Sequence, residues 1–474
     1  MSFKCDDCLA AIVICLNFYM LGIQESSLYT ILPKYLVDEP FNATNNETFK
    51  PNTSRTIFQC HLQKPPYFIV SMIFLSKSLA QFFFNSIIGC FVDKVNNFII
   101  LLIGQGLGII IALIYALNNS ITMYIVGRLL DAFVSCSLFI GGFSIVSKLF
   151  SNVNTRGRFF GLGNTLYFVS HSIGPVYGAE VDVRLGKSAV FFLLIPLWIF
   201  TMAATFILYR RTEKRCNKSK NNCNEKLSIG VTPDETNELD DHNELKVAII
   251  ISSISKTPEK YSDFKGEKKF QKENKEIFMK FYKIMKNPYV SSCLCQLFIV
   301  NLSMFALPAT LPSWMGFRLC ATEIQQGLVW AFGFIGYVSG VGLIVLLLKC
   351  AYQLRFFSPI IAQIIVGILL ILLPFSHDWR LLFIPIIGMY FSVGVIEQVL
   401  FPLTTYLADH HFNSDYGSMA SLTSQSLTLS GVVGTLSSGP IAQRFGFRSL
   451  CICLGILNLL FCLLSLPHQK LVQS

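Results

Sequence analysis

Long apolar stretches recur along this chain and limit what it can fold into. A helix needs about 20 apolar residues to cross a hydrocarbon core about 30 Å thick. In lipid, helices satisfy their own backbone hydrogen bonds, and stretches this long and continuous are not barrel strands. We expect an all-α membrane protein with about twelve transmembrane helices, near residues 9–35, 67–90, 98–117, 122–148, 159–179, 188–209, 289–312, 326–348, 356–375, 381–406, 417–439 and 449–466.

Charge is scarce and concentrated in one place. The chain is 53% hydrophobic and 14% charged, with 42 Phe and 4 Trp, a balance that soluble domains rarely show. The net charge of +10 could suggest nucleic acid. However, 18 of the 38 Lys and Arg residues fall between residues 210 and 286, among 13 acidic residues. This stretch is therefore predicted to be a mixed, solvated linker, and we expect the lipid bilayer rather than nucleic acid as a partner.

The apolar stretches divide into two sets of six. Residues 1–209 and 287–474 are predicted to form two six-helix halves, joined by a largely disordered cytoplasmic linker at 210–286. The halves resemble each other weakly: "SIGPVYGAEVDVRLG" and "TLSSGPIAQRFGFR" both place Gly-Pro near a helix end, followed by a basic loop and another helix. Such repetition is typical of transporters whose substrate site lies between related halves.

Loop charges and glycosylation motifs predict the same topology. Lys and Arg concentrate in "YRRTEKRCNKSK" after the sixth helix, which marks the cytoplasmic side and places both termini there. Four Asn-x-Ser/Thr motifs then fall on the lumenal side, at Asn42, Asn46, Asn52 and Asn118. We expect a multi-pass glycoprotein of the plasma membrane or of a secretory-pathway vesicle.

Two of the 15 cysteines also fall in predicted lumenal loops. Cys60 and Cys320 follow the first and the seventh predicted helices. The lumen is oxidising, so a disulfide bond between them is compatible with this topology.

The second predicted helix carries a lysine inside an apolar stretch. Lys77, Gln81 and Asn85 are spaced by four and share one helical face, which we expect to line a water-filled space. A charge at this depth is costly, so it persists where it faces a cavity or a partner.

The fourth helix contains "GRLLDAF", with Arg128 and Asp131 three positions apart and close enough to pair. Two interpretations stay open. The pair is structural and neutralises itself, or Arg128 holds a water chain or a neighbouring carboxylate in a transport path.

Two further carboxylates lie within predicted helices. Glu25 is in the first helix and Glu397 in the tenth. A carboxylate near Lys77 could take up and release a proton, as proton-coupled antiport requires. Glu25 and Glu397 are both candidates for that carboxylate. Alternatively, Glu25 lies near the outer surface and is hydrated.

No pattern at a useful spacing indicates a hydrolase, a kinase or a metal site, so we expect neither enzyme activity nor a cofactor. His171 is more readily explained as a hydrogen-bonded packing residue than as a ligand.

Two motifs resemble the major facilitator superfamily. "GCFVDK", containing Gly89, Asp93 and Lys94, is similar to its conserved loop after the second helix, which serves conformational change. Gly174, Pro175 and Gly178 resemble its antiporter motif, in which these residues permit close packing and bending.

A closer resemblance, over most of both halves, is to the vesicular amine transporter family with its polyamine branch. It rests on "FLSKSLAQFFFNSIIG", "ALPATLPSWM", "YLADHHFNSDYGSMASL" and "GRLLDAF". This resemblance implies that Lys77 belongs to a charge network, Arg128 acts in gating or the proton path, and Glu397 couples protons. It also implies a lumenal bridge between Cys60 and Cys320.

The chain departs from that family at three positions. Leu21 and Leu307 stand where the monoamine carriers have acidic residues, and Ser424 replaces a lysine partner. Without those family residues, Glu397 is the candidate partner of Lys77 and Glu25 the candidate contact for a cationic solute. The prediction is therefore a secondary transporter that exchanges protons for an organic cation such as a polyamine, by alternating access. Two alternatives remain: an organic-anion transporter, and a non-transporting receptor or scaffold.

Overall fold

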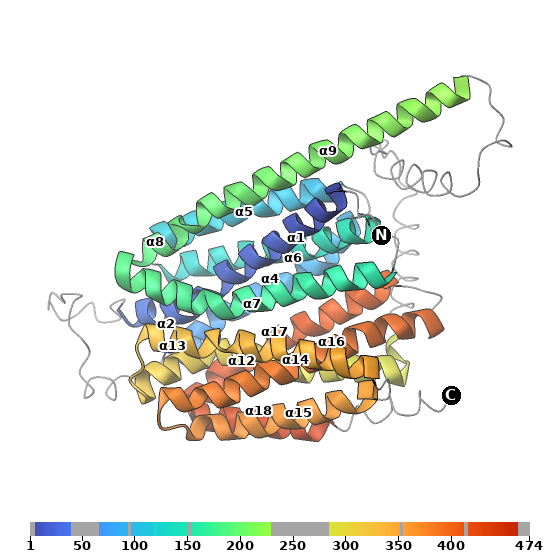
Figure 1. Cartoon of the computed structure of the whole chain (residues 1–474). Helices are drawn as coiled ribbons and strands as arrows, with labels where there is room; N and C mark the ends of the chain where they lie inside the picture. Colours follow the sequence, from blue (N-terminus) through green and yellow to red (C-terminus); the bar gives the residue numbers. More distant parts are fainter. Residues whose placement is uncertain are drawn as a thin grey trace, which may run out of the picture.

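The chain forms a bundle of long, roughly aligned helices (Figure 1). The computed structural model describes residues 5–38, 66–92, 96–118, 120–149, 153–228, 284–350, 354–411 and 416–462. All regular structure in these ranges is helical, which agrees with the predicted all-α fold.

The first half contains α1 to α9. These helices are α1 (Cys5–Ser26), α2 (Leu28–Asp38), α4 (Tyr67–Val92), α5 (Asn97–Leu117), α6 (Ile121–Leu149), α7 (Val153–Leu185), α8 (Lys187–Phe192) and α9 (Leu194–Ser228). The second half contains α12 (Pro288–Arg318), α13 (Glu323–Ala331), α14 (Gly333–Cys350), α15 (Leu354–Leu372), η1 (Leu373–Phe375), η2 (Trp379–Leu382), α16 (Phe383–His411), α17 (Tyr416–Phe445) and α18 (Phe447–Phe461).

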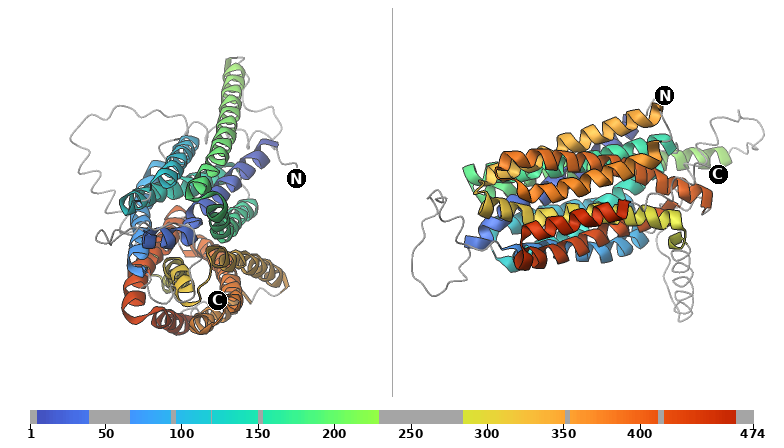
Figure 2. Two further views of the ribbon diagram at one scale, coloured as in Figure 1. Left: turned by 90° about the vertical axis from the view of Figure 1, so that its left-hand side faces the viewer. Right: turned by 90° about the horizontal axis from the view of Figure 1, so that it is seen from below.

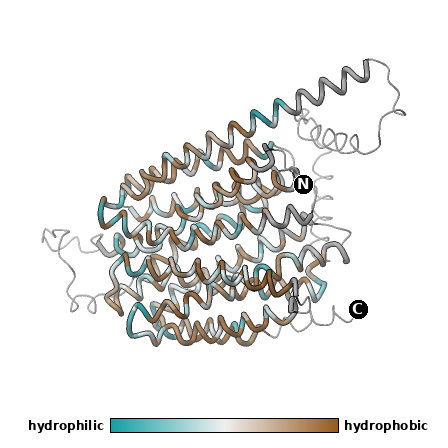
Figure 3. Tube along the Cα trace, viewed as in Figure 1, coloured by the Kyte–Doolittle hydropathy of each residue, from teal (hydrophilic) through white to brown (hydrophobic). Residues whose placement is uncertain are grey.

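Nine spans among the described residues are long and apolar enough to cross a membrane. The helices α7, α17 and α18 occupy the three remaining predicted windows. Hydrophobic residues run along the helices, and hydrophilic residues gather near several helix ends (Figure 3). One boundary differs from the prediction, because α9 continues to Ser228 and extends past its neighbours (Figure 1). The division at residues 209 and 286 therefore stays a prediction.

Helix ends follow local sequence signals. Asn96 caps α5 by accepting a hydrogen bond from the Phe98 amide, and Asn287 caps α12 in the same way with Pro288 as the first helical residue. Gly186 and Gly446 adopt positive φ angles of 86° and 88° at the corners after α7 and α17. These equivalent glycines give the weak sequence repeat a structural counterpart.

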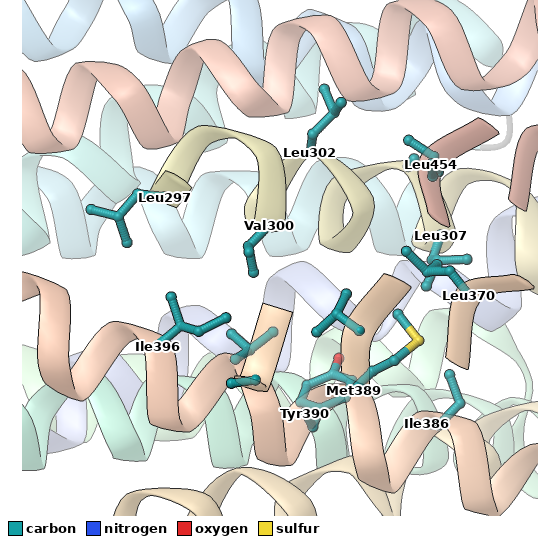
Figure 4. Close-up of a cluster of buried hydrophobic side chains, with 14 of the residues drawn as sticks. Leu297, Val300, Leu302, Leu307, Leu370, Ile386, Met389, Tyr390, Ile396 and Leu454 are labelled. Carbon is teal, nitrogen blue, oxygen red and sulfur yellow. The ribbon is translucent and has the colours of Figure 1, made fainter. Parts of the chain in front are cut away.

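Each half has its own apolar core. One cluster of buried side chains is formed mainly by the helices from α1 through α9. Another is formed mainly by the helices from α12 through α18. Figure 4 shows part of the second, with Leu307 among leucines, isoleucines and methionine. Leu21 is likewise buried in the first. Leu21 and Leu307, two of the three positions that depart from the expected family pattern, are therefore packing positions.

The halves meet along two seams. On one side α4 packs against α17, and on the other α7 packs against α13 and α14. The end-on view in Figure 2 shows the blue-to-green and the yellow-to-red helices as two groups, with α4 beside α17. This arrangement sets α7 between α1 of its own half and α13 of the other.

The antiporter-like motif packs α7 closely against α1. A Cβ atom at Gly174 would lie 2.0 Å from Ser26 Oγ, and one at Gly178 would lie 2.6 Å from the Ser27 carbonyl oxygen. The Pro175 carbonyl, inside α7, accepts a hydrogen bond from Thr30 Oγ1 at 3.1 Å. Glycine is needed here because the backbones of two helices nearly touch.

We expect Gly178→Ala to destabilise the protein, because the new methyl group meets backbone that cannot rotate away. The cost should be about 1–3 kcal/mol, seen as a lower melting temperature by tryptophan fluorescence in detergent. Gly106→Ala in α5 is the matched control, since a Cβ there meets nothing within 4 Å. Equal melting temperatures for the two variants would contradict this account of the α1–α7 contact.

Candidate functional site

Four charged side chains meet inside the first half. Glu25 comes from α1, Lys77 from α4, and Arg128 and Asp131 from α6. Lys77 Nζ forms ion pairs with Glu25 Oε2 and, at 3.6 Å, with Asp131 Oδ2. No residue of this charge cluster is more than 7% exposed. Two buried cations and two buried anions give a net charge of zero, which limits the cost of placing them away from water.

Arg128 connects the charge cluster to α1. Its Nη1 lies 3.3 Å from Asp131 Oδ2, so the pair expected from the i, i+3 spacing is present. Its Nη2 donates a hydrogen bond to the Glu25 carbonyl oxygen at 3.4 Å, and its guanidinium lies 4.4 Å from the centre of the Phe74 ring. The atoms Arg128 Nε and Asp131 Oδ1 have no hydrogen-bond partner among the described residues.

The predicted pairing of Lys77 with Glu397 is wrong. Lys77 pairs with Glu25 and Asp131 in its own half. Glu397, in α16, forms no ion pair with any described residue. Its Oε2 accepts a hydrogen bond from Tyr337 Oη at 3.0 Å. The cause is topological, since α6 packs against α4 and α1 packs against α6, which brings acids of the same half close to Lys77.

Aromatic side chains surround Glu25. Tyr167 in α7 donates a hydrogen bond to Glu25 Oε2 at 3.1 Å. Tyr29 Oη lies 2.7 Å from His171 Nε2, which agrees with the packing role expected for His171. The Tyr29 ring also lies 5.9 Å from Trp330 of the second half. Glu25 is 7% exposed, so the alternative that it is hydrated at the outer surface does not hold.

Glu397 has a different environment. It is 1% exposed, and its described neighbours are neutral: Tyr337 and the amides of Asn164 and Asn301. Asn164 belongs to α7 of the first half, and its Nδ2 donates a hydrogen bond to Tyr337 Oη at 3.3 Å. The hydrogen-bond chain Asn164–Tyr337–Glu397 therefore crosses between the halves.

The polar face of α4 has two uses. Lys77 points into the charge cluster, whereas Asn85 donates a hydrogen bond to Thr428 Oγ1 of α17 at 2.8 Å. The Cys136 thiol donates a hydrogen bond to Asn85 Oδ1 at 3.1 Å. Asn85 is thus packed between α6 and α17 instead of lining a water-filled space as expected. Gln81, one turn away, is half-buried.

Several predicted residues lie outside the described ranges. These are Asp93 and Lys94 of the loop motif, Cys60 of the predicted bridge, and three of the four glycosylation motifs, Asn42, Asn46 and Asn52. Gly89 lies in the last turn of α4, and Asn118 ends α5. Cys320 lies between α12 and α13, with φ 51°. The loop motif, the bridge and glycosylation stay predictions.

Sequence reasoning missed the neutral members of both sites. Tyr167, Tyr337 and Asn164 carry no charge and belong to no motif, and Tyr29 and Trp330 read as ordinary aromatic residues of apolar helices. The one available signal was a polar side chain at helix mid-depth, which applies to Asn164. Nothing in the spacing indicated which helix each would face.

Comparison with known proteins gives one family. The model described as Major Facilitator Superfamily matches residues 8–435. The vesicular acetylcholine transporter of Tetronarce californica is 21% identical over 95% of this chain and 78% of its own length. The chromaffin granule amine transporter of Rattus norvegicus is 22% identical over 85% of the chain and 66% of its length. The synaptic vesicular amine transporter of Homo sapiens is 21% identical over 83% and 65%.

The charge balance of the cluster predicts the effect of removing one member. Lys77→Met leaves Glu25 and Asp131 with Arg128 as the one cation of the charge cluster, and we expect a cost of about 3–5 kcal/mol. In the double variant Glu25→Gln/Lys77→Met the remaining Arg128–Asp131 pair is neutral, so most of the stability should return. The measurement is the melting temperature of each purified protein. A double variant as unstable as Lys77→Met would show that packing, and not charge balance, sets the loss.

Proposed function

Since this chain belongs to the major facilitator superfamily, we propose that it is a secondary active transporter that exchanges an organic cation for protons. Residues 8–435 match the family model, so both halves of the bundle are included. The three relatives described above are named for acetylcholine or amines. Such solutes are small organic cations, and the site must offer them negative charge and aromatic faces.

The ion pair between Glu25 and Lys77 is the observation that carries the proposal. It is buried, lies within one half and accepts a hydrogen bond from Tyr167, and the neighbouring Tyr29 ring contacts Trp330 of the other half. A substrate ammonium can take the place of the Lys77 ammonium beside Glu25, and Lys77 then keeps Asp131 as its partner. The faces of Tyr29 and Trp330 then stabilise the cation further. In this role Lys77 is a competitor that occupies the site when substrate is absent.

The same pair weakens the anion alternative. Two buried cations without partners, Lys77 and Arg128, would favour an anion. Each is within 3.6 Å of a carboxylate oxygen, so neither cation is in excess. An incoming anion would have to break one of these pairs and leave a buried carboxylate uncompensated, which is strongly unfavourable.

Glu397 is the residue we assign to proton coupling. It is buried in the second half with neutral neighbours, and a carboxylate that lacks a cation in such a place is accommodated most readily with a proton bound. Asn164 reaches this group through Tyr337, so the hydrogen bonds around Glu397 depend on whether the halves are joined at α7 and α14. Separation of the halves removes one of them and exposes Glu397 to water, where the proton can be released.

A polyamine fits this arrangement better than a monoamine. Leu21 and Leu307, where the monoamine carriers have acids, are buried in the two apolar cores. The remaining carboxylates that could receive ammonium groups belong to different halves, Glu25 to the first and Glu397 to the second. A flexible chain with several ammonium groups could contact both, whereas a single ammonium could contact one.

The proposed orientation places the α9 extension in the cytoplasm. Arg210, Arg211 and Lys214 follow the apolar part of α9, as expected for a cytoplasmic end. The opposite end of the bundle, with α2, α8 and α13, then faces the lumen of a secretory-pathway vesicle or the outside of the cell. Protons would leave the lumen as the cation enters it.

The proposal predicts uptake of labelled spermidine by proteoliposomes that are acidic inside. Glu397→Gln should abolish uptake driven by the proton gradient, because the variant cannot carry the proton. It should retain exchange of labelled for unlabelled spermidine without a gradient, at a lower apparent affinity, because Glu25 is intact and one of the two ammonium contacts is lost. Glu180→Gln is the matched control, since this carboxylate pairs with Arg184 on α7 away from both sites.

Three results would contradict the proposal in different ways. Unchanged gradient-driven uptake by Glu397→Gln would remove Glu397 from coupling. Uptake of an anionic dye instead of spermidine would favour an organic-anion transporter. Uptake of neither, with no thermal stabilisation by any candidate ligand, would favour a non-transporting receptor or scaffold.

A further inference from the structure

A second group of charges lies at the end of the bundle that carries α2 and α13. Lys34 of α2 points its ammonium between two carboxylates, 2.8 Å from Asp182 Oδ2 of α7 and 3.6 Å from Glu323 Oε1 of α13. Tyr35 Oη donates a hydrogen bond to the other oxygen of Asp182 at 2.9 Å. Asp182 and Lys34 belong to the first half and Glu323 to the second. The Lys34–Glu323 pair therefore joins the two halves.

The two carboxylates are held differently. The Asp182 side chain is 1% exposed and has two partners from its own half, Lys34 and Tyr35. The Glu323 side chain is 29% exposed and stands at the first position of α13, where a negative charge is favoured by the helix N-terminus. Lys34 is also 29% exposed. If the halves separate, Lys34 keeps Asp182, and Glu323 becomes hydrated at a helix end that stabilises it.

Backbone packing beside this pair shows how closely the halves approach. A Cβ at Gly327, one turn along α13 from Glu323, would lie 2.8 Å from the Pro175 carbonyl oxygen and from Val176 Cα of α7. The three atoms nearest to that position are backbone atoms, which cannot rotate away. The α7–α13 seam is therefore tightly closed here, and Lys34 and Glu323 pair beside it.

We propose that the Lys34–Glu323 pair is a reversible latch that holds this end of the transporter closed. Asp182 keeps Lys34 in place through the cycle, so opening breaks one partly exposed ion pair and leaves no buried charge unpaired. Such pairs contribute little each, which suits a contact that must break in every cycle. The inference goes beyond the transport proposal, since it concerns separation of the halves and not the solute.

The test measures the distance between the two halves at this end. Nitroxide labels are placed at Leu185 of α7 and Leu381 of η2, which are 68% and 50% exposed. They are attached to a genetically encoded ketone amino acid, because the chain has 15 cysteines. A second pair at Arg210 and Phe357 reports the opposite end. Each sample is measured with and without reductant, since the predicted Cys60–Cys320 bridge would also join the halves.

Glu323→Gln should raise the ratio of open to closed protein about two- to five-fold, the range that a partly exposed ion pair supports. Glu323→Lys should raise it further, because Lys34 is then repelled. In both, the distances between Arg210 and Phe357 should shift toward shorter values. Neither variant buries a new charge, so folding should be retained.

Glu180→Gln and Glu180→Lys are the matched controls. Glu180 pairs with Arg184 within α7 near the same end, so these variants change the same charges without breaking an ion pair between the halves. The latch is refuted if both Glu323 variants give the wild-type distance distribution, or if the Glu180 variants shift it equally. Since spermidine uptake is not the readout, failure of the transport proposal would leave this result interpretable.

Discussion

Charge neutrality in a membrane-buried interior is the constraint on which this structure depends. The charge cluster of Glu25, Lys77, Arg128 and Asp131 satisfies it with paired charges from three helices of one half. Glu397 in the other half has neutral described neighbours, so a proton is the simplest means of neutralising it. In one half a substrate cation can compete with Lys77 for Glu25, and in the other half Glu397 can bind and release a proton. The proposed antiport follows from this separation, with the paired charges in the first half and the protonatable carboxylate in the second.

The contacts between the halves are suited to repeated separation. Asn85 meets Thr428 on one seam, and Asn164 meets Tyr337 on the other, each through one hydrogen bond between neutral groups. Each of these groups can bond to water when the seam opens, so little net free energy is lost per contact. The close approach of Gly327 to α7 adds packing that is present in the closed form. The polar contacts described here between the halves are therefore ones that water can replace.

The sequence was sufficient for the helices and for contacts within one helix. Hydrophobic length predicted where the helices lie, and the i, i+3 spacing predicted the Arg128–Asp131 pair, because both depend on local geometry. The partner of Lys77 could not be found in this way. Glu25 and Glu397 are both carboxylates in apolar helices, and the choice between them depends on how α1, α4 and α6 are arranged in the first half.

Packing also determined which polar residues join the sites. Asn164 and Tyr337 are 173 positions apart and become neighbours because α7 lies against α14. The same packing explains why Leu21 and Leu307 are core residues, which hydrophobicity alone allowed but did not require. The extension of α9 past residue 209 had no signal either, since its polar residues are compatible with both helix and loop.

The central claim is that Glu397 carries a proton while the charge cluster remains ionised. Infrared difference spectroscopy of the purified protein, recorded between acidic and alkaline pH, detects protonated carboxyl groups directly through their C=O stretch. We predict such a band in the wild type and in Glu25→Gln, and its loss in Glu397→Gln. A band that persists in Glu397→Gln and disappears in Glu25→Gln would place the proton in the charge cluster and contradict the account.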